Sequence, residues 1–371
     1  MNIEESFQAM QRKLPRSAFD FLAFYSSVLG GIVEDPALMT VPMDEHMVHR
    51  GHAVFDTCNV SQGQCYGLGF HLDRLLRSAG LARIHPSYTK EELRQIILST
   101  VAASQQREGV FVRFWMTAGR GDFSVSSKET TGSGFFVMVH RYKSKEELKL
   151  QGIDEYVIQD IPLKNRLLAS IKSTNYLTNA LVCESAEGMG GCLGIQVDES
   201  GRLAESSIAN IAILTPHGML RTPPFEKVLA GTTVKRLWEL AEERLKPQGI
   251  VRGVEYTHIT LDELLSATEA YSLGGGSVLP IVRINGKNIG GGKPGPVFKE
   301  LDDLLLCDMK TNYLDAVPYH HYAPGGWLKR GLRALKERWR RTDGYLMATV
   351  LLALPFTFFL GKIRGGPTFV L

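Results

Sequence analysis

The chain has 371 residues, of which 44% are hydrophobic and 22% charged, and its formal net charge is +3. This balance excludes an intrinsically disordered protein, and a charge so close to zero gives no reason to expect a nucleic-acid partner. Five cysteines without metal-ligand spacing predict reduced thiols in an intracellular compartment, most simply the cytoplasm, and no metal site.

In chain order, residues 1–20 are predicted to be a short polar leader and residues 21–145 a small α+β domain. The sequence SQGQ at 61–64 predicts a hairpin turn between two strands. Strands are expected in 21–33, 52–68, 109–119 and 133–142, and amphipathic helices in 71–84 and 90–104.

Residues 146–312 are predicted to form a second domain, reached through the charged linker 143–152. Its opening helix includes the segment ASIKSTNYLTNALVCE at 169–184 and is expected to bury Leu177, Ala180, Leu181 and Glu184. A strand is expected in 156–162, a hairpin with the turn DESG in 192–215, and further helices in 232–245, 261–268 and 297–310.

Residues 313–371 are predicted to be a C-terminal tail that begins basic, in LKRGLRALKERWRR, and becomes apolar at 345–361. The apolar run contains Pro355 and is near the lower length limit for a membrane span. Basic residues before it would suit the cytoplasmic side of a membrane. A membrane anchor, an extra packed hairpin and a tail unrelated to the function are the three readings.

Glycine-rich segments suggest where an anion could bind, although none has a nucleotide-binding motif. SLGGGSVLP lacks GxGxxG spacing, and LAGTTVKR lacks Walker spacing. A helix that starts at Thr232 and Thr233 would offer free backbone N–H groups, and Gly275 and Gly276 would let the backbone approach an anion closely. Lys172, taken alone, is more typical of a solvated surface lysine.

Six segments in a fixed order change that interpretation: HLDRLLRSA, IKSTNYLTNAL, LAESSIANI, VLAGTTVKR, GGGSVLPIV and INGKNIGGGKPGPV. The series resembles the class IV aminotransferases, which are fold-type IV enzymes that use pyridoxal 5′-phosphate (PLP), and the resemblance covers 24–309. MVHRGHAVFDT and TAGRGDF make it nearest to plant-type D-amino acid aminotransferase-like proteins. It implies two α+β domains, a smaller N-terminal α/β domain and a larger barrel-like C-terminal one, with PLP between them in a homodimer. Plant relatives make a plastid the alternative location.

The resemblance also assigns roles to residues. Lys172 matches the lysine that forms a Schiff base with PLP, and burial would help it lose its proton. Glu205 matches the carboxylate that pairs with the pyridine nitrogen. The remaining cofactor-binding positions are Arg74, Thr232 and Thr233 on the phosphate, Leu229 on the ring face, and Gly274 and Gly275 as the second phosphate contact, with help from Ser277.

The substrate residues are less well defined by the resemblance. The arginine that holds the substrate carboxylate in bacterial D-amino acid aminotransferases falls on Ala118, so Arg120 is the candidate replacement. A tyrosine of the first strand falls on Phe55, and Tyr176 and Asn210 are expected to line the pocket.

The expected activity is transfer of an amino group between a D-amino acid and a 2-oxo acid. Aminodeoxychorismate lyase, which releases pyruvate and 4-aminobenzoate for folate synthesis, is the second reading, and branched-chain aminotransferase the third. A membrane-tethered pseudoenzyme or scaffold is the reading from a different functional class.

Overall fold

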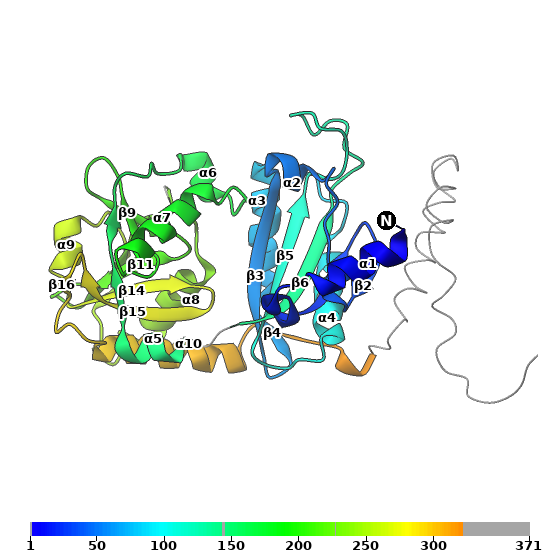
Figure 1. The fold of residues 1–371 in the computed structure, drawn as a ribbon. Helices are drawn as coiled ribbons and strands as arrows, with labels where there is room; N and C mark the ends of the chain where they lie inside the picture. The colour runs from blue at the N-terminus through cyan, green and yellow to red at the C-terminus, as the bar shows by residue number, and fades with distance from the viewer. Residues whose placement is uncertain (1, 143–144, 227, 322–371) are drawn as a thin grey trace, which may run out of the picture. The chain divides into compact units, whose positions relative to one another are not determined.

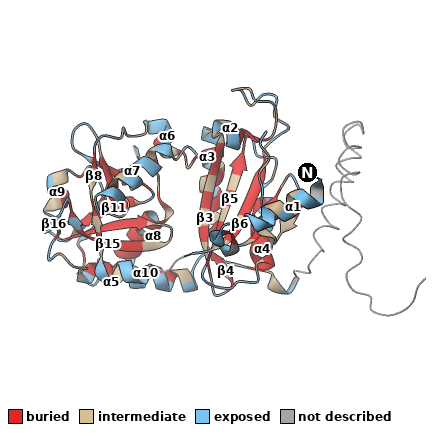
Figure 2. Ribbon diagram, viewed as in Figure 1, coloured by how far each residue is buried: buried red, intermediate tan, exposed pale blue. Residues whose placement is uncertain are grey.

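The computed structural model describes residues 2–142, 145–226 and 228–321. They lie within one compact unit, Met1–Pro324, which is built around two β-sheets (Figure 1). Buried residues concentrate in the strands of both sheets and on the helix faces that cover them (Figure 2). We call the regions around the two sheets the first and second domains.

The described residues of the first domain include a seven-stranded antiparallel sheet in the order β17-β4-β3-β5-β6-β1-β2. Its strands are β1 (Phe21–Ser26), β2 (Gly31–Val33), β3 (Ala53–Ser61), β4 (Gln64–Tyr66), β5 (Val110–Thr117), β6 (Phe135–Arg141) and β17 (Leu314–Ala316). Helices α3 (Leu68–Leu81) and α4 (Lys90–Ala103) pack on one face of it (Figure 1).

Alternation along β3 and β5 decides which side chains are free to form a site. Val54 and Phe114 point into the core beneath the helices, whereas Phe55, Thr57 and Arg113 point to the opposite face. The two-residue turn Gln62–Gly63 has φ values of +49° and +74°, which suit a tight hairpin and confirm the turn predicted at SQGQ.

The second domain has a branched, barrel-like sheet of ten strands among the described residues, as the resemblance implied. Strands β16, β15, β14, β11, β10, β9 and β8 follow one another; β12 and β13 branch from β11, and β7 pairs with β15. The bounds are β7 (Ile153–Glu155), β8 (Val157–Ile158), β9 (Ile195–Val197), β10 (Leu203–Ser206), β11 (Asn210–Leu214), β12 (Met219–Thr222), β13 (Gly253–Tyr256), β14 (Glu269–Gly274), β15 (Ser277–Ile284) and β16 (Lys287–Asn288).

The helices of this domain include the three predicted in 232–245, 261–268 and 297–310. They are α5 (Glu146–Gln151), α6 (Arg166–Ser170), α7 (Leu177–Gly188), α8 (Thr232–Leu240), which continues as a π-helical segment over Ala241–Leu245, α9 (Leu261–Leu265) and α10 (Pro296–Thr311). The DESG turn lies between β9 and β10, also as predicted.

The buried face predicted for the helix containing 169–184 is wrong. Helix α7 buries Asn179, Val182 and Ala186, whereas Leu177 is 72% exposed, and Ala180, Leu181 and Glu184 are exposed as well. The prediction placed leucines on the buried face because it followed the apolar residues. Asn179 lies on that face instead, because its amide donates a hydrogen bond to the Ser207 carbonyl.

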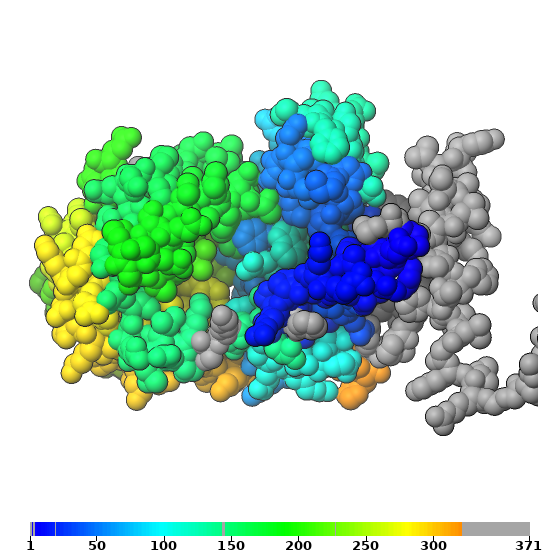
Figure 3. Space-filling model, viewed as in Figure 1, coloured from blue at the N-terminus to red at the C-terminus, as the bar shows by residue number. Residues whose placement is uncertain are grey.

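The predicted leader, linker and tail contain regular secondary structure. The polar leader contains helix α1 (Ile3–Arg12), started by a capping box between Asn2 and Glu5, and it lies on the surface of the first domain (Figure 3). The linker 143–152 contains α5. Strand β17 lies beyond the predicted boundary at residue 313; it pairs with β4 and so completes the first sheet.

No helix within the described ranges is long and apolar enough to span a membrane. The basic segment and the apolar run at 345–361 lie outside the described residues.

Candidate active site

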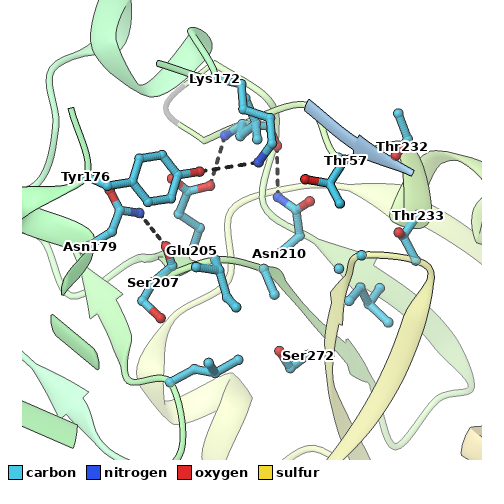
Figure 4. Close-up of a pocket in the computed structure, with 18 of the residues that line it drawn as sticks. Thr57, Lys172, Tyr176, Asn179, Glu205, Ser207, Asn210, Thr232, Thr233 and Ser272 are labelled. Atoms are coloured by element: carbon cyan, nitrogen blue, oxygen red, sulfur yellow. Dashed lines mark hydrogen bonds between the residues drawn. The ribbon is translucent and has the colours of Figure 1, made fainter. Parts of the chain in front are cut away.

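A cavity of about 300 Å³ lies between the two domains and receives side chains from both (Figure 4). Lys172 lies in the segment between α6 and α7, whose backbone is fixed against the first domain. The Phe55 N–H donates to the Lys172 carbonyl at 2.9 Å, and the Lys172 N–H donates to Ser78 Oγ at 3.2 Å. The lysine therefore emerges from a pinned backbone, and its side chain enters the cavity.

The side chain of Lys172 is surrounded by aromatic rings. Its Nζ donates to the Tyr176 hydroxyl at 3.3 Å (Figure 4). It also lies 4.7 Å from the centre of the Phe55 ring. Burial lowers the pKa of Lys172 from 10.5 to about 8; the Arg74 guanidinium acts in the same direction, while Asp56 and Glu205 oppose it. Lys172 is thus a cavity lysine that loses its proton easily, not a solvated one.

Glu205 lies on β10 and is connected by hydrogen bonds to two other predicted residues, Leu229 and Asn210. Its Oε2 accepts the Leu229 N–H at 3.0 Å, and the Leu229 carbonyl accepts a hydrogen bond from the Asn210 amide at 2.9 Å. Glu205 and Asn210 face each other across β10 and β11. Lys164 forms an ion pair with Glu205 at 3.4 Å. The structure brings Glu205, Leu229 and Asn210 to one wall of the cavity.

Another wall is formed by the start of α8 and the glycine turn between β14 and β15. Thr232 and Thr233 open the helix, and the Thr233 hydroxyl accepts the Gly276 N–H at 3.1 Å. Gly275 and Gly276 have φ values of +61° and +69°. The positive φ of Gly276 favours glycine, and a Cβ there would lie 2.1 Å from the Asn59 amide nitrogen, so the Asn59 side chain would have to move. With Gly274, these residues form a backbone cradle suited to an anion.

Arg74 lines the same cavity from α3, but one edge of its guanidinium is already occupied. Its Nε and Nη2 donate to the two carboxylate oxygens of Asp56, each at 2.7 Å. His71 Nδ1 donates to Asp56 Oδ1 at 2.8 Å. Although burial acts in the opposite direction, Arg74 and His71 hold the pKa of Asp56 far below its ordinary value.

Phe55 and Tyr176 line the cavity, their rings 5.1 Å apart, whereas Arg120 does not line it. Arg120 forms a bidentate pair with Asp44, with donor–acceptor distances of 2.8 to 3.0 Å. Its loop runs past the end of β5, so the guanidinium of Arg120 lies outside the cavity lining, and its role as the substrate arginine stays a prediction.

Arg113 is the residue that the sequence reasoning missed. It lies opposite Thr57 on the cavity face of β5 and donates to the Thr57 hydroxyl at 3.1 Å, with its guanidinium carbon 5.6 Å from the Phe55 ring centre. Among the described residues no carboxylate forms an ion pair with it, and burial lowers its pKa. The strand was predicted, but its register against the strand of Phe55, which places Arg113 on the cavity face, was not. Lys145, Lys164 and Asn179 also line the cavity without having been predicted.

Three comparisons with known proteins agree with this geometry. The amino-transferase class IV family model matches residues 53–284. The chain is 40% identical over 309 residues to the chloroplastic D-amino-acid transaminase of Arabidopsis thaliana, with 82% of each chain covered. It is 25% identical to the D-alanine aminotransferase of Bacillus licheniformis, over 71% of this chain and 90% of that one.

Solved structures show the same fold. The branched-chain amino acid aminotransferase of Escherichia coli superposes with a TM-score of 0.72 at 23% identity, over 80% of this chain and 99% of that one. The T.th. branched-chain amino acid aminotransferase with pyridoxamine 5′-phosphate also gives 0.72, at 21% identity over the same shares. By sequence and by fold, the chain belongs to the class IV aminotransferases, a family of PLP-dependent enzymes.

Proposed function

We propose that this enzyme transfers the amino group of a D-amino acid to a 2-oxo acid, with PLP held in the cavity. The observation that carries the proposal is the meeting of Lys172, Glu205 and Arg74 in one cavity, although they come from three distant segments. The relative with 40% identity is named as a D-amino-acid transaminase, which supports the D-amino acid as substrate.

The donor set of the cavity fits PLP. The glycine turn and the start of α8 offer backbone N–H groups for the phosphate, with the Nη1 side of Arg74 nearby. Lys172 would hold the cofactor covalently through Nζ, Glu205 would accept a hydrogen bond from the ring nitrogen, and Leu229 would pack on the ring. When bound, PLP supplies an electrophilic carbonyl and an electron sink.

Lys172 is suited to both attachment and proton transfer. With a pKa of about 8, about a quarter of the amine is neutral at pH 7.5, against roughly one in a thousand for an ordinary lysine. The neutral amine can take a proton from the substrate α-carbon and return it. Tyr176, whose pKa is raised by burial and by Glu205, stays protonated and holds Nζ in place.

Arg113 supports an acidic substrate. A largely buried guanidinium that lines the cavity, without an ion-pair partner among the described residues, favours a substrate carboxylate. Lys145, whose pKa is lowered by burial, lines the same side and adds to the positive field. Amino and 2-oxo acids with carboxylates therefore suit this cavity.

The decisive experiment combines a spectrum with a product assay. The purified protein reconstituted with PLP should show a visible absorbance band that borohydride abolishes and that Lys172→Ala lacks. D-alanine with 2-oxoglutarate should then yield D-glutamate. Release of pyruvate and 4-aminobenzoate from aminodeoxychorismate, without an acceptor, would instead make the protein the lyase. A colourless protein that cannot be reconstituted would support the scaffold reading.

We also propose a homodimer. Exposed apolar side chains gather on and beside α6 and α7 near the mouth of the cavity, which favours burial against a second copy. These residues, which we call the α6–α7 patch, are Leu167, Leu168, Leu177, Leu181 and Ile208.

A plastid location is proposed from the chloroplastic relative. Membrane contact through 328–361 is tested by deleting the residues after 325 and following the protein through cell fractionation.

A further inference from the structure

Two of the three guanidinium nitrogens of Arg74 are already bound by a carboxylate and do not face the cavity as free donors. Its Nε and Nη2 edge, the edge that normally grips an oxyanion with two parallel bonds, is bound by Asp56. Nη1 points toward the second domain, 3.4 Å from the Ala230 carbonyl beside the start of α8. An anion in the cradle therefore meets mainly the Nη1 side of an arginine whose orientation is set by Asp56.

Asp56 itself is completely buried, with 0% of the residue exposed. Besides Arg74 and His71, its Oδ1 accepts the Thr57 N–H at 2.7 Å. His71 and Arg74 lie three residues apart on one face of α3, so one carboxylate on β3 engages both. Since a buried carboxylate is strongly unfavourable without partners, this network holds all three side chains in one arrangement.

Charges from several elements meet around Lys172 Nζ. Arg74 on α3 and Arg113 on β5 disfavour its protonated form, whereas Asp56 on β3 and Glu205 on β10 favour it. The Tyr176 hydroxyl contacts Nζ, and Lys164 is the cation paired with Glu205. Asp56 is thus one of two carboxylates that offset two buried guanidinium groups around the amine.

We infer that Asp56 is a positioning residue of the active site, which fixes the Nη1 side of Arg74 toward the anion cradle and balances the charge around the Lys172 amine. It acts through Arg74 and through the field, without touching the cofactor. The identity of the anion as the PLP phosphate rests on the proposed function, whereas the effect on Lys172 does not.

The first test uses the protein without PLP. The titration of Lys172 is followed by NMR of 13C-labelled lysine, assigned by the signal that Lys172→Met lacks. Asp56→Asn should lower the Lys172 pKa by about one unit, because a nearby negative charge is lost. Arg74→Gln should raise it, and the double variant should return it toward the wild-type value. These opposite shifts keep the test decisive if either single variant folds poorly.

Asp308→Asn is the matched control. Asp308 is also buried and forms the same fork, accepting from Arg236 Nε at 3.0 Å and Nη2 at 2.8 Å, but it is not among the charges that shift Lys172. A role for Asp56 limited to stability predicts similar losses of melting temperature in both variants and an unchanged Lys172 titration. That result would overturn the inference.

The second test measures the affinity for PLP by fluorescence quenching of the apoprotein. Asp56→Asn should weaken binding by about tenfold or more, since Arg74 loses its fixed orientation, and Asp56→Glu should restore part of the loss. Equal affinities for Asp56→Asn and wild type would contradict the positioning role. If the wild-type protein binds no PLP at all, the proposed function fails, while the Lys172 titration still decides the effect on the amine.

Discussion

Lys164 Nζ lies 3.4 Å from Glu205 Oε1, so the carboxylate assigned to the cofactor ring already has a cation beside it. Glu205 is also held by the Leu229 N–H, which leaves it buried, oriented and paired. Two partners from different segments therefore fix the Glu205 carboxylate at the wall of the cavity.

Removing the Glu205 charge should therefore be costly for activity. Glu205→Gln keeps the shape of the side chain but removes the charge-assisted hydrogen bond, which is worth about 1.5–3 kcal/mol, so kcat should fall about 10- to 100-fold. Lys164→Gln should change kcat much less, because the Leu229 N–H still holds the carboxylate. Steady-state kinetics over a range of pH distinguishes the two, and an unchanged kcat in Glu205→Gln would argue against its assigned role.

The low pKa of Lys172 predicts a pH dependence of stability in the apoprotein. Between pH 8 and 10.5 the unfolded chain holds a proton on Lys172 that the folded chain has lost, so the free energy of unfolding should gain a positive contribution as pH rises through this window. Its full size is about 3.5 kcal/mol at most, from about 1.4 kcal/mol per pKa unit.

Urea unfolding of Lys172→Met should lack this contribution and should show higher stability than wild type at pH 7, since no charge is buried. Lys299→Met, a change at an exposed lysine on α10, is the control and should leave the wild-type pH dependence intact. Parallel pH profiles for wild type and Lys172→Met would show that the buried amine carries no such penalty.

Substitutions of Arg113 and Arg120 test which arginine binds the substrate carboxylate. Arg113→Met should raise KM for 2-oxoglutarate about 10- to 100-fold, because a charge-assisted pair in a buried site is lost. Arg120→Met, which breaks only the partly exposed pair with Asp44, should change KM little. The reverse pattern would return the role to the arginine that the sequence suggested, reaching the cavity of a second copy.

The α6–α7 patch predicts a dimer that charge can break. Leu177→Glu with Leu181→Glu should shift the protein from dimer to monomer, because burying two carboxylates in an apolar contact is strongly unfavourable. Light scattering coupled to gel filtration gives the mass directly. Leu150, 79% exposed on α5 away from this patch, provides the control change Leu150→Glu, which should leave the mass unchanged. A wild-type monomer would refute the dimer.

The sequence was sufficient to predict the cavity residues that lie in short motifs with a defined backbone conformation. Glu205, Leu229 and Asn210 were predicted from separate segments, and the structure joins them by two hydrogen bonds through one backbone unit. The glycine turn and the start of α8 were found for the same reason, since positive φ values and a helix start depend on local residues.

It was insufficient where a side chain's role depends on pairing across the fold. Arg113 and Arg120 are both arginines of one strand and its loop, and only the β3–β5 register shows that Arg113 shares a face with Phe55. Asn179 turned inward because the Ser207 carbonyl needed a donor, which no hydrophobic period reveals. Asp56 gave no signal in the sequence, since its partners lie on a different element.

Strand β17 has a consequence for how the chain folds during synthesis. Because the outer neighbour of β4 among the described residues is Leu314–Ala316, the first domain cannot finish its sheet until nearly the whole second domain has left the ribosome. Until then β4 presents an open edge to other chains. A nascent chain stalled before residue 314 should therefore be a client for chaperones, although every residue that lines the cavity has already been made.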